Sequence, residues 1–506
     1  GGEALDEALA LAFSHVLETG VVPAVWRTGA MRCVPKKGNT SIFTNHRGVV
    51  LTSHVAKLFE RVMLRRLLTV AEADEAQAVA NAGVDCRTQI HLLLDACAAY
   101  RDESGGDDVW IMTIDITRGF PSTPRALVVE ALRTAGVGGR LMRAIMGLIF
   151  GTSVVVGVRP GVETRRVPLG VGLLEGAVLS PALFALATSG LLVTLRASGL
   201  GVRVGGVWAG ALMLMDDLVL LARSEAELRE MTAIVFRWAH ENRYVLALSE
   251  KSHVLRLGPV DEAPAAEATY TRLRWSPPDG APEATIDVSF KHESTLAYLG
   301  FLVSARGGPD AHVGRQLGTA GSVVDRMEAE YGGRACITFG QALYLWTLHG
   351  RSHVEWPAAV LPPGGRATVR FDQLQFRALR ALLGEHAHRP AYRVLLAVFG
   401  LWNMEERYLF ARAKYAFAWL LAERRPWRAA LGSTLRRLDV DGDDDGFPRE
   451  SVTGAVSAAL VRLGFDDWPE DLRPDEGAFA PGIPGRGLAA APAPPNGDSS
   501  SDDEAE

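Results

Sequence analysis

Two neighbouring aspartates interrupt one of the most apolar stretches of the chain. Asp216 and Asp217 separate Ala211–Met215 from Leu218–Ala222, and no Lys or Arg lies within five residues of Asp216. A carboxylate among such neighbours loses hydration, so it must pair with a cation, bind a metal or stay protonated. Two apolar runs joined by only two residues are typical of a β-hairpin. The sequence therefore predicts a hairpin whose tip carries both acids.

A third acid ends another apolar run. Asp115 follows Val109–Ile114, which is short and rich in apolar and β-branched residues, as strands are. Carboxylates that converge from separate strands can hold hard divalent cations, and two such cations can stabilise the attacking and leaving oxygens of a phosphoryl transfer. The alternative is that Asp216 and Asp217 are only turn residues, which is a common use of aspartate.

The first 300 residues alternate helical and strand-like patterns, which predicts an α+β fold. Apolar residues at helical spacing predict helices over Leu5–Leu17 and His54–Val79, and the run Thr152–Val158 predicts a further strand. After residue 300 the pattern is helical. The helices expected there are Val313–Tyr331, Phe339–Leu348, Gln373–Leu383 and Glu405–Arg424.

Charge is divided unevenly along the 506 residues. From Asp439 to the end there are 17 acidic and only 4 basic residues, whereas residues 304–438 carry 19 basic and 10 acidic residues. A basic surface suits a polyanion such as nucleic acid, although surplus arginine can also form a solvated helix face. The end of the chain, rich in Asp, Gly, Pro and Ser, cannot bury enough apolar surface to offset its ordering entropy, so we expect disorder there.

Composition argues against several classes of protein. The chain is 48% hydrophobic and 22% charged, which is typical of a globular protein rather than a fibre or a fully disordered chain. Four cysteines without a C-x-x-C pair argue against a disulfide scaffold or a classical zinc module. The charge-free run Gly176–Leu195 is long enough to span a bilayer, but its Ser, Thr and Pro residues favour a buried helix. We therefore expect no membrane partner.

Short motifs follow one another along the first 301 residues. Gly20–Trp26 together with Val34–Gly38 forms the first motif. The second, Asn45–Thr52, compares with Asn-Tyr-Arg-Pro-Ile-Ser-Leu, with Gly48 in place of proline. The third, Asp115–Phe120, compares with Asp-x-x-x-Ala-Phe.

Four more motifs complete the series. Gly172–Pro181 compares with Gly-Val-x-Gln-Gly-x-x-Leu-Ser-Pro, with Glu175 in place of glutamine, and Leu214–Asp217 compares with aromatic-x-Asp-Asp. Lys251 and Tyr298–Phe301 follow. In this order, the seven motifs resemble the reverse transcriptase domain of non-long-terminal-repeat (non-LTR, LINE-like) retrotransposons.

The resemblance implies a right-hand polymerase fold with fingers, a palm with an antiparallel sheet, and a helical thumb. Residues 1–303 would form the fingers and palm, residues 304–438 the thumb and connection region, and residues 439–506 an acidic, mostly disordered tail. The implied enzyme is an RNA-directed DNA polymerase that binds an RNA template, a DNA primer and dNTPs. Its cofactors would be two Mg²⁺ ions, with Mn²⁺ possible, and its location the nucleus. The oligomeric state stays open.

The resemblance also assigns catalytic roles. Asp115 and Asp216 would bind the two metal ions, with Asp217 beside them and less directly engaged. Lys251 would protonate the leaving pyrophosphate, and the alternative is an ordinary surface lysine.

Five residues would lie beside the incoming nucleotide. Lys37 and Arg47 would hold the triphosphate, although Lys37 could also be a solvated loop residue. Phe120 would exclude a 2′ hydroxyl from below the sugar, or simply pack in the core. Glu175 would place a negative charge near the triphosphate, and Gly176 would let the backbone approach the nucleotide or would be a plain turn glycine.

Nucleic acid would be held by the later motifs. Tyr298, Leu299 and Gly300 would form the primer grip by resemblance. The basic residues proposed for phosphate contact, which could equally be solvated helix faces, are Arg377, Arg380, Arg389, Arg393, Arg424, Arg425 and Arg428.

Two other activities stay open. A catalytically inactive palm, from a relic or a domesticated copy, could bind RNA as a structural subunit. The departures at Glu175 and at Gly48, which would loosen a loop, are the observations that favour this alternative. An RNA-dependent RNA polymerase also uses an Asp-Asp hairpin. No endonuclease is recognisable, so we expect the chain to be one part of a larger element protein or a truncated copy.

Overall fold

A computed structural model describes residues 2–421, apart from 37–38, 43–44, 79–84, 160–161, 249–251, 259–269, 278–284, 306–309, 332–338, 357, 359, 361–364 and 384–390. Several predictions of the sequence fall outside these residues. They concern Lys37, Lys251, Arg389, Arg424, Arg425, Arg428 and the acidic tail.

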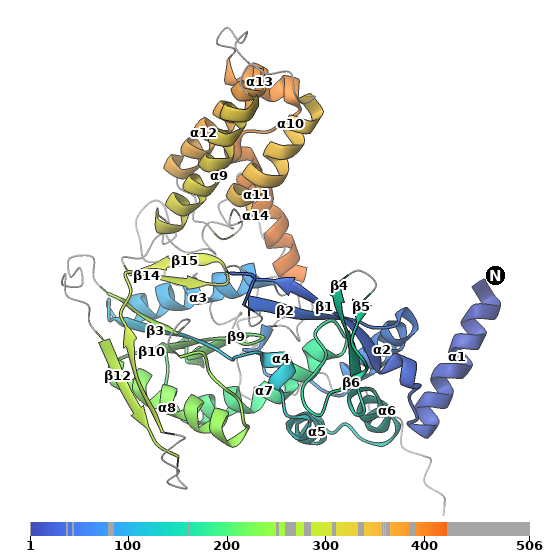
Figure 1. Ribbon diagram of the computed structural model, residues 1–506. Coiled ribbons are helices and arrows are strands. Elements are labelled where there is room, and N and C mark those ends of the chain that lie inside the picture. Colours follow the sequence, from blue (N-terminus) through green and yellow to red (C-terminus); the bar gives the residue numbers. More distant parts are fainter. Residues whose placement is uncertain are drawn as a thin grey trace, which may run out of the picture. The chain divides into compact units, whose positions relative to one another are not determined.

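A four-stranded antiparallel sheet forms the palm (Figure 1). In spatial order its strands are β11 (His253–Leu257), β3 (Val109–Asp115), β10 (Asp217–Ala222) and β9 (Ala211–Leu214). The predicted hairpin is confirmed, but its tip is shifted by one residue. Asp217 pairs with both Leu214 and Asp115, so it belongs to the ladder, and the two turn residues are Met215 and Asp216.

Both faces of the palm sheet are buried, which explains why its strands are almost continuously apolar. Alternate residues of β3 and β10 enter two different hydrophobic clusters: Ile114 and Leu220 enter one, and Ile111 and Val219 enter the other. The first cluster includes α7 (Ser180–Ala197) and α8 (Glu225–Glu241), and the second includes α3 (Cys86–Glu103). The sheet is thus fixed between helices, and the acids lie at the ends of its strands.

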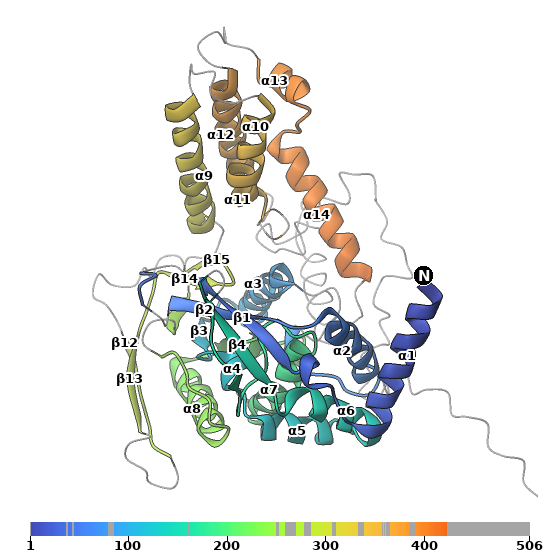
Figure 2. The ribbon, with the colours of Figure 1, turned by 45° about the vertical axis from the view of Figure 1, so that its right-hand side comes forward.

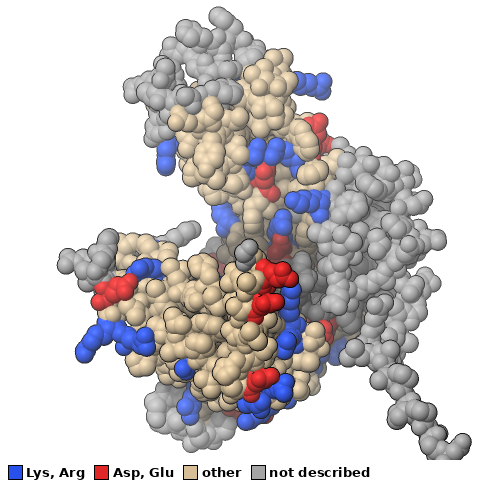
Figure 3. All heavy atoms as spheres, turned by 90° about the vertical axis from the view of Figure 1, so that its right-hand side faces the viewer, with Lys and Arg blue, Asp and Glu red and all other residues tan. Residues whose placement is uncertain are grey.

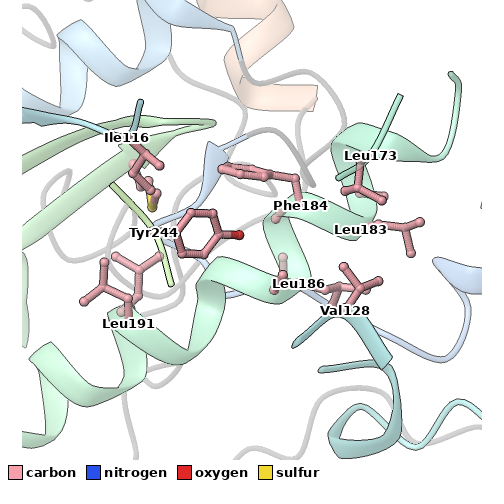
Figure 4. Close-up of a cluster of buried hydrophobic side chains, with 14 of the residues drawn as sticks. Ile116, Val128, Leu173, Leu183, Phe184, Leu186, Leu191 and Tyr244 are labelled. Atoms are coloured by element: carbon pink, nitrogen blue, oxygen red, sulfur yellow. The ribbon is translucent and has the colours of Figure 1, made fainter. Parts of the chain in front are cut away.

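The charge-free run of the sequence forms α7 in this core. Of the helices in the described part of the chain, α7 is the one long and apolar enough to cross a membrane, and 61% of that 18-residue window is buried. Figure 4 shows Leu183, Phe184, Leu186 and Leu191 of α7 among buried residues of other elements, including Ile116 and Tyr244. This burial agrees with the expected core helix.

In a second sheet, β1, β2 and β4 lie side by side (Figure 2). Strand β1 (Thr28–Pro35) is antiparallel to β2 (His46–Leu51) and parallel to β4 (Ser153–Arg159). The short strands β5 (Val162–Glu163) and β6 (Val167–Pro168) both pair with β4. Besides α3, the helices described in residues 2–150 are α1 (Gly2–Thr19), a 3-10 turn at Ala24–Trp26, α2 (His54–Leu67), α4 (Gly119–Ser122), α5 (Arg125–Thr134) and α6 (Gly139–Ile149).

One helix prediction was too long. The helix expected over His54–Val79 ends at Leu67, and the chain then buries Ala71, Ala73 and Ala76. The Ala76 carbonyl accepts a hydrogen bond from the Met213 N–H of β9 at 2.8 Å. Docking against the palm sheet therefore replaces the helical bonds that the apolar pattern predicted.

The remaining elements complete the expected α+β right hand. Short antiparallel pairs are β7 (Arg203–Val204) with β8 (Val207–Trp208), β12 (Tyr270–Trp275) with β13 (Ile286–Lys291), and β14 (Thr295–Tyr298) with β15 (Phe301–Ser304). The predicted helical region follows as α9 (Asp310–Tyr331), α10 (Phe339–Leu345), a π-helical segment (Trp346–Arg351), α11 (Ser352–Glu355), α12 (Gly365–Leu383), α13 (Tyr392–Phe399) and α14 (Met404–Leu421).

Candidate active site

The three predicted acids meet at one end of the palm sheet. Asp115 is the last residue of β3 and Asp217 is the first of β10, and the two are register partners. Asp216 directly precedes Asp217 and lies in the turn between β9 and β10, where its carbonyl accepts a hydrogen bond from the Ile116 N–H at 3.1 Å. Asp115 is buried, Asp216 is half-buried and Asp217 is exposed. The sheet thus brings together acids that lie about a hundred residues apart in the sequence.

A glycine allows the chain to pass directly beneath this hairpin. A Cβ atom added to Gly119 would lie 3.1 Å from the Asp216 Cβ and 3.1 Å from the Phe184 ring. Such separations are tighter than ordinary van der Waals contact. The departure from alanine in the motif Asp-x-x-x-Ala-Phe therefore has a local reason in this chain, since even a methyl group would press on Asp216.

The carboxylates of Asp115 and Asp216 are oxygen donors of the kind that a hard divalent cation prefers, so the donor set fits Mg²⁺ or Mn²⁺. In the part of the chain that the structure describes, no group of three or more His, Cys, Asp or Glu side chains is arranged to hold a metal ion. The two-ion site therefore stays a prediction, with substrate oxygens and water needed to complete any coordination shell.

Glu175 is influenced by side chains of both charges at this site. Burial raises the pKa of Glu175, and the charge of Asp216 acts in the same direction, whereas Arg47 and Lys36 lower it. Its Oε2 is buried and has no hydrogen-bond partner within the described part of the chain. The negative charge that the sequence analysis placed near a triphosphate is thus opposed by two cations. Lys36, which was not among the predicted site residues, is one of these two cations.

The loop that carries Glu175 packs against β2. The Glu175 carbonyl accepts a hydrogen bond from the Val50 N–H at 2.7 Å, and Gly176 has a φ of +114°. A Cβ on Gly176 would lie only 2.4 Å from the Val50 carbonyl oxygen. Close approach to the β2 backbone therefore requires glycine here, whatever this residue does for the nucleotide.

The expected loosening effect of Gly48 was wrong. Gly48 lies within β2 and pairs with Cys33 of β1, so the strand ladder orders it. A Cβ there would lie 3.1 Å from the Met31 Sδ. Arg47, the neighbouring residue, is exposed on the same strand and is available to an anionic ligand.

Phe120 is half-buried in α4, next to the glycine beneath the hairpin. Its ring lies 5.1 Å from the Phe184 ring, between centroids, with a tilt of 35°. The ring thus rests on the core with part of its surface accessible. Its predicted role in excluding a 2′ hydroxyl stays a prediction.

The expected primer grip forms the tip of the β14–β15 hairpin, but its three residues are not equally accessible. Tyr298 is buried, with 2% of its surface exposed, and its hydroxyl has no hydrogen-bond partner among the residues that the structure describes. Burial raises the pKa of Tyr298 above its ordinary value, and the charge of Asp217 acts in the same direction. Leu299 is half-buried and Gly300 is exposed, so only these two are presented at the surface. A primer contact through the Tyr298 hydroxyl is therefore excluded in this conformation.

The arginines predicted to contact phosphate are not all available. Arg377 forms ion pairs with Asp325 at 2.8 Å and Glu328 at 2.7 Å, and the Arg380 guanidinium lies over the Phe376 ring. Figure 3 shows basic and acidic side chains interspersed on the face that it draws. The basic excess of the helical region is thus partly used within the protein.

Glu60 is a site residue that the sequence analysis missed. It lies on α2, with 5% of its surface exposed, and accepts hydrogen bonds from the N–H groups of Val178 at 2.5 Å and Leu179 at 3.0 Å. Burial raises the pKa of Glu60, and these two bonds act in the opposite direction. Glu60 therefore holds the end of the Gly172–Pro181 motif. Its position on the apolar face of an amphipathic helix was the available signal.

Two solved telomerase structures from Candida tropicalis are loosely similar to this chain. The complex with a TWJ fragment of telomeric RNA is 8% identical and covers 85% of this chain and 68% of the solved chain, with a TM-score of 0.41. The apo telomerase is 9% identical and covers 89% and 74%, with a TM-score of 0.39. TM-scores at this level do not establish a shared fold.

Sequence comparison is more informative. The Retrovirus-related Pol polyprotein from type-1 retrotransposable element R2 of Popillia japonica is 28% identical over 222 residues, which are 44% of this chain and 31% of the relative. The match thus spans about a third of the relative's length. A family model described as reverse transcriptase (RNA-dependent DNA polymerase) matches residues 34–303, which is more than half of the chain and includes the palm sheet. The chain therefore belongs to the reverse transcriptase family of RNA-dependent DNA polymerases.

Proposed function

We propose that this chain is the polymerase part of a non-LTR retrotransposon protein, which copies an RNA template into DNA from a DNA primer. The observation that carries the proposal is the pairing of Asp115 with Asp217 at the ends of adjacent palm strands, with Asp216 in the turn between β9 and β10. The similarity to the R2 polyprotein supports this class of element.

In the proposed reaction, the primer 3′ oxygen forms a bond to the α-phosphate of a dNTP, and pyrophosphate leaves. Asp115 and Asp216 would hold two divalent cations, Mg²⁺ or Mn²⁺, with Asp217 beside them. When bound, the cations would stabilise the negative charge on the attacking and leaving oxygens. Arg47 and Lys36 would attract the triphosphate, since both are exposed cations close to Glu175.

The remaining assignments follow the family resemblance. Phe120 would lie below the sugar of the nucleotide, and Lys251 would protonate pyrophosphate. Residues 1–303 would act as fingers and palm, and residues 304–438 as the thumb and connection region, followed by an acidic tail over 439–506. Because elements of this class insert into chromosomal DNA, we propose that the chain acts in the nucleus.

Primer extension tests this function. The reaction contains an RNA template annealed to a DNA primer, Mg²⁺ and either dNTPs or rNTPs, and parallel reactions use Asp216→Asn or a metal chelator. We expect extension with dNTPs that both Asp216→Asn and chelation abolish. RNA binding without extension would show an inactive RNA-binding palm, and preferential use of rNTPs would show an RNA polymerase.

A further inference from the structure

A side chain from outside the palm sheet binds the turn that carries Asp216. Gln77 lies in the segment after α2 and is fully buried, with 0% of its surface exposed. Its Oε1 accepts a hydrogen bond from the Met215 N–H at 3.0 Å, and its Nε2 donates to the Met215 carbonyl at 3.3 Å. One amide group therefore pairs with both polar backbone groups of a single turn residue.

The orientation of this amide is fixed by a second contact. Nε2 also donates to the Thr188 Oγ1 at 3.1 Å, and the Thr188 hydroxyl in turn donates to the Phe184 carbonyl at 3.0 Å. A flipped amide would direct its NH₂ group at the Met215 N–H, which would place donor against donor. Thr188 is fully buried on α7. It therefore holds the Gln77 amide in the one orientation that can form hydrogen bonds with both the N–H and the carbonyl of Met215.

The backbone around Gln77 is also bound to the hairpin. Gln77 forms a parallel bridge with Met213, and the Gln77 N–H donates to the Asp74 carbonyl at 2.9 Å. The side chain therefore extends from a segment that is already docked on β9. This arrangement leaves Gln77 little freedom to follow the turn if the turn changes its conformation.

The turn needs such external support. Met215 has a φ of +57°, in the left-handed region that residues with a Cβ rarely adopt. The tip sequence Leu214–Asp217 contains no glycine that would adopt this conformation readily. Because Met215 precedes Asp216, its backbone conformation sets the direction in which the Asp216 side chain leaves the turn.

We propose that Gln77 is the positioning residue of this turn: its amide keeps Met215 left-handed, so that the Asp216 carboxylate stays at the place where nucleotidyl transfer needs it. The inference rests on the proposed function, since it assigns Gln77 a part in the same reaction. Gln77 touches neither the substrate nor the reacting atoms, and it acts only through Met215.

The first experiment replaces Gln77 by methionine, which has a similar length but cannot form these hydrogen bonds. In Gln77→Met we expect the kcat of primer extension to fall by about 10- to 100-fold, with RNA binding within about twofold of wild type. The matched control is Gln89→Met, which changes a glutamine of α3 that is equally buried, at 1% exposed. Extension within about threefold of wild type is expected for Gln89→Met. Near-normal kcat in folded Gln77→Met would overturn the proposal.

A second readout does not need polymerase activity. Hydrogen exchange measured at single amides should show the Met215 N–H protected in wild type and at least about tenfold faster in Gln77→Met. The amides of Val219 and Leu221, in the middle of β10, should exchange at wild-type rates. Unchanged exchange at Met215, or equal acceleration along all of β10, would refute positioning. A wild-type protein inactive in extension would instead refute the proposed function, while the exchange comparison would still decide this inference.

Thr188→Val provides a milder variant in case Gln77→Met does not fold. Valine has nearly the shape of threonine but offers no acceptor to the Gln77 amide. We expect a loss of about three- to tenfold in kcat and a smaller acceleration of Met215 exchange than in Gln77→Met. Wild-type values of both quantities in Thr188→Val would contradict the proposed orientation of Gln77.

Discussion

The two hairpins that carry predicted site residues reverse the chain in different ways. The β14–β15 hairpin turns through Leu299 and Gly300, which both have positive φ, a pattern that fits the natural twist of paired strands. The β9–β10 hairpin turns through Met215 and Asp216, and of these only Met215 has a positive φ. Positive φ at the first turn residue alone is the pattern in which glycine is preferred.

This difference shows where each turn gets its stability. The β14–β15 turn has glycine at one of its two positions, so its own sequence supports the conformation. The β9–β10 turn has a methionine where the left-handed backbone costs about 1–2 kcal/mol, and tertiary contacts must offset that cost. Unfavourable backbone conformations tend to persist at functional sites, where the surrounding structure maintains them.

The largest effect is expected when the acids of the candidate active site are replaced. Asp115→Asn and Asp216→Asn should each lower primer extension by about a thousandfold or more, because loss of a charged ligand removes transition-state stabilisation worth several kcal/mol. RNA binding, measured by filter retention, should stay within a few-fold. The control is Asp287→Asn, which changes an exposed carboxylate of β13 that pairs with Arg272 of β12. More than about a tenth of wild-type extension in either Asp115→Asn or Asp216→Asn would disprove the assignment.

The next effect concerns Phe120, which follows Gly119 beneath the β9–β10 hairpin. Phe120→Val should increase the use of rNTPs relative to dNTPs by at least about tenfold, because the smaller side chain leaves room for a 2′ hydroxyl. The matched control is Phe236→Val, which changes a buried phenylalanine of α8. It should lower stability by up to about 3 kcal/mol without changing the ratio of rNTP to dNTP use. An unchanged ratio in stable, active Phe120→Val would count against the gate and favour the RNA polymerase alternative.

A smaller effect would test how far Gly300 stabilises the β14–β15 turn. Gly300 has a φ of +86°, and among the described residues a Cβ there would meet only the Trp356 ring, at 3.7 Å. Gly300→Ala should therefore lower stability by about 1 kcal/mol through backbone strain alone, which is a few degrees in Tm. Gly105→Ala, at a similar φ of +76° with nothing within 4 Å, should cost about the same. No loss in Gly300→Ala would show that this turn can relax.

The smallest effect is expected at Tyr298. Its buried hydroxyl has no hydrogen-bond partner in the described residues, so Tyr298→Phe should leave the free energy of unfolding unchanged or raise it by up to about 1 kcal/mol. Tyr392→Phe is the opposite case, because the Tyr392 hydroxyl donates to Asp372 at 2.6 Å and accepts from Gln375 at 2.8 Å. That variant should lose about 1–3 kcal/mol in thermal or denaturant unfolding. A similar loss in Tyr298→Phe would reveal a partner for its hydroxyl.

Strands β3, β9 and β10 of the palm could be predicted from sequence because their apolar runs are short and end at acids or turns, whereas β11 was not predicted. The same pattern overextended the helix after His54, since periodicity does not reveal that Ala76 bonds to Met213. Tertiary docking, and not local preference, ended that helix at Leu67.

The residues that support the site could not be predicted from the sequence, for a related reason. Gln77 and Glu60 bind backbone groups that lie 138 and 118 residues further along the chain, and any residue type offers such groups. Motifs identify side chains with a chemical role, such as Asp115 and Asp216. A residue that holds a backbone in place needs the fold to be seen.

The parallel pairing of β1 with β4 has a consequence for how the chain folds during synthesis. Thr28 pairs with Ser153, so 125 residues separate the two partners. At about 5–20 residues per second, a ribosome needs roughly 6–25 seconds to make that interval. During this time β1 can pair only with β2, and its other edge is open to wrong partners. Chaperone demand should therefore be greatest before β4 emerges, and slower translation of the interval should increase aggregation of nascent fingers.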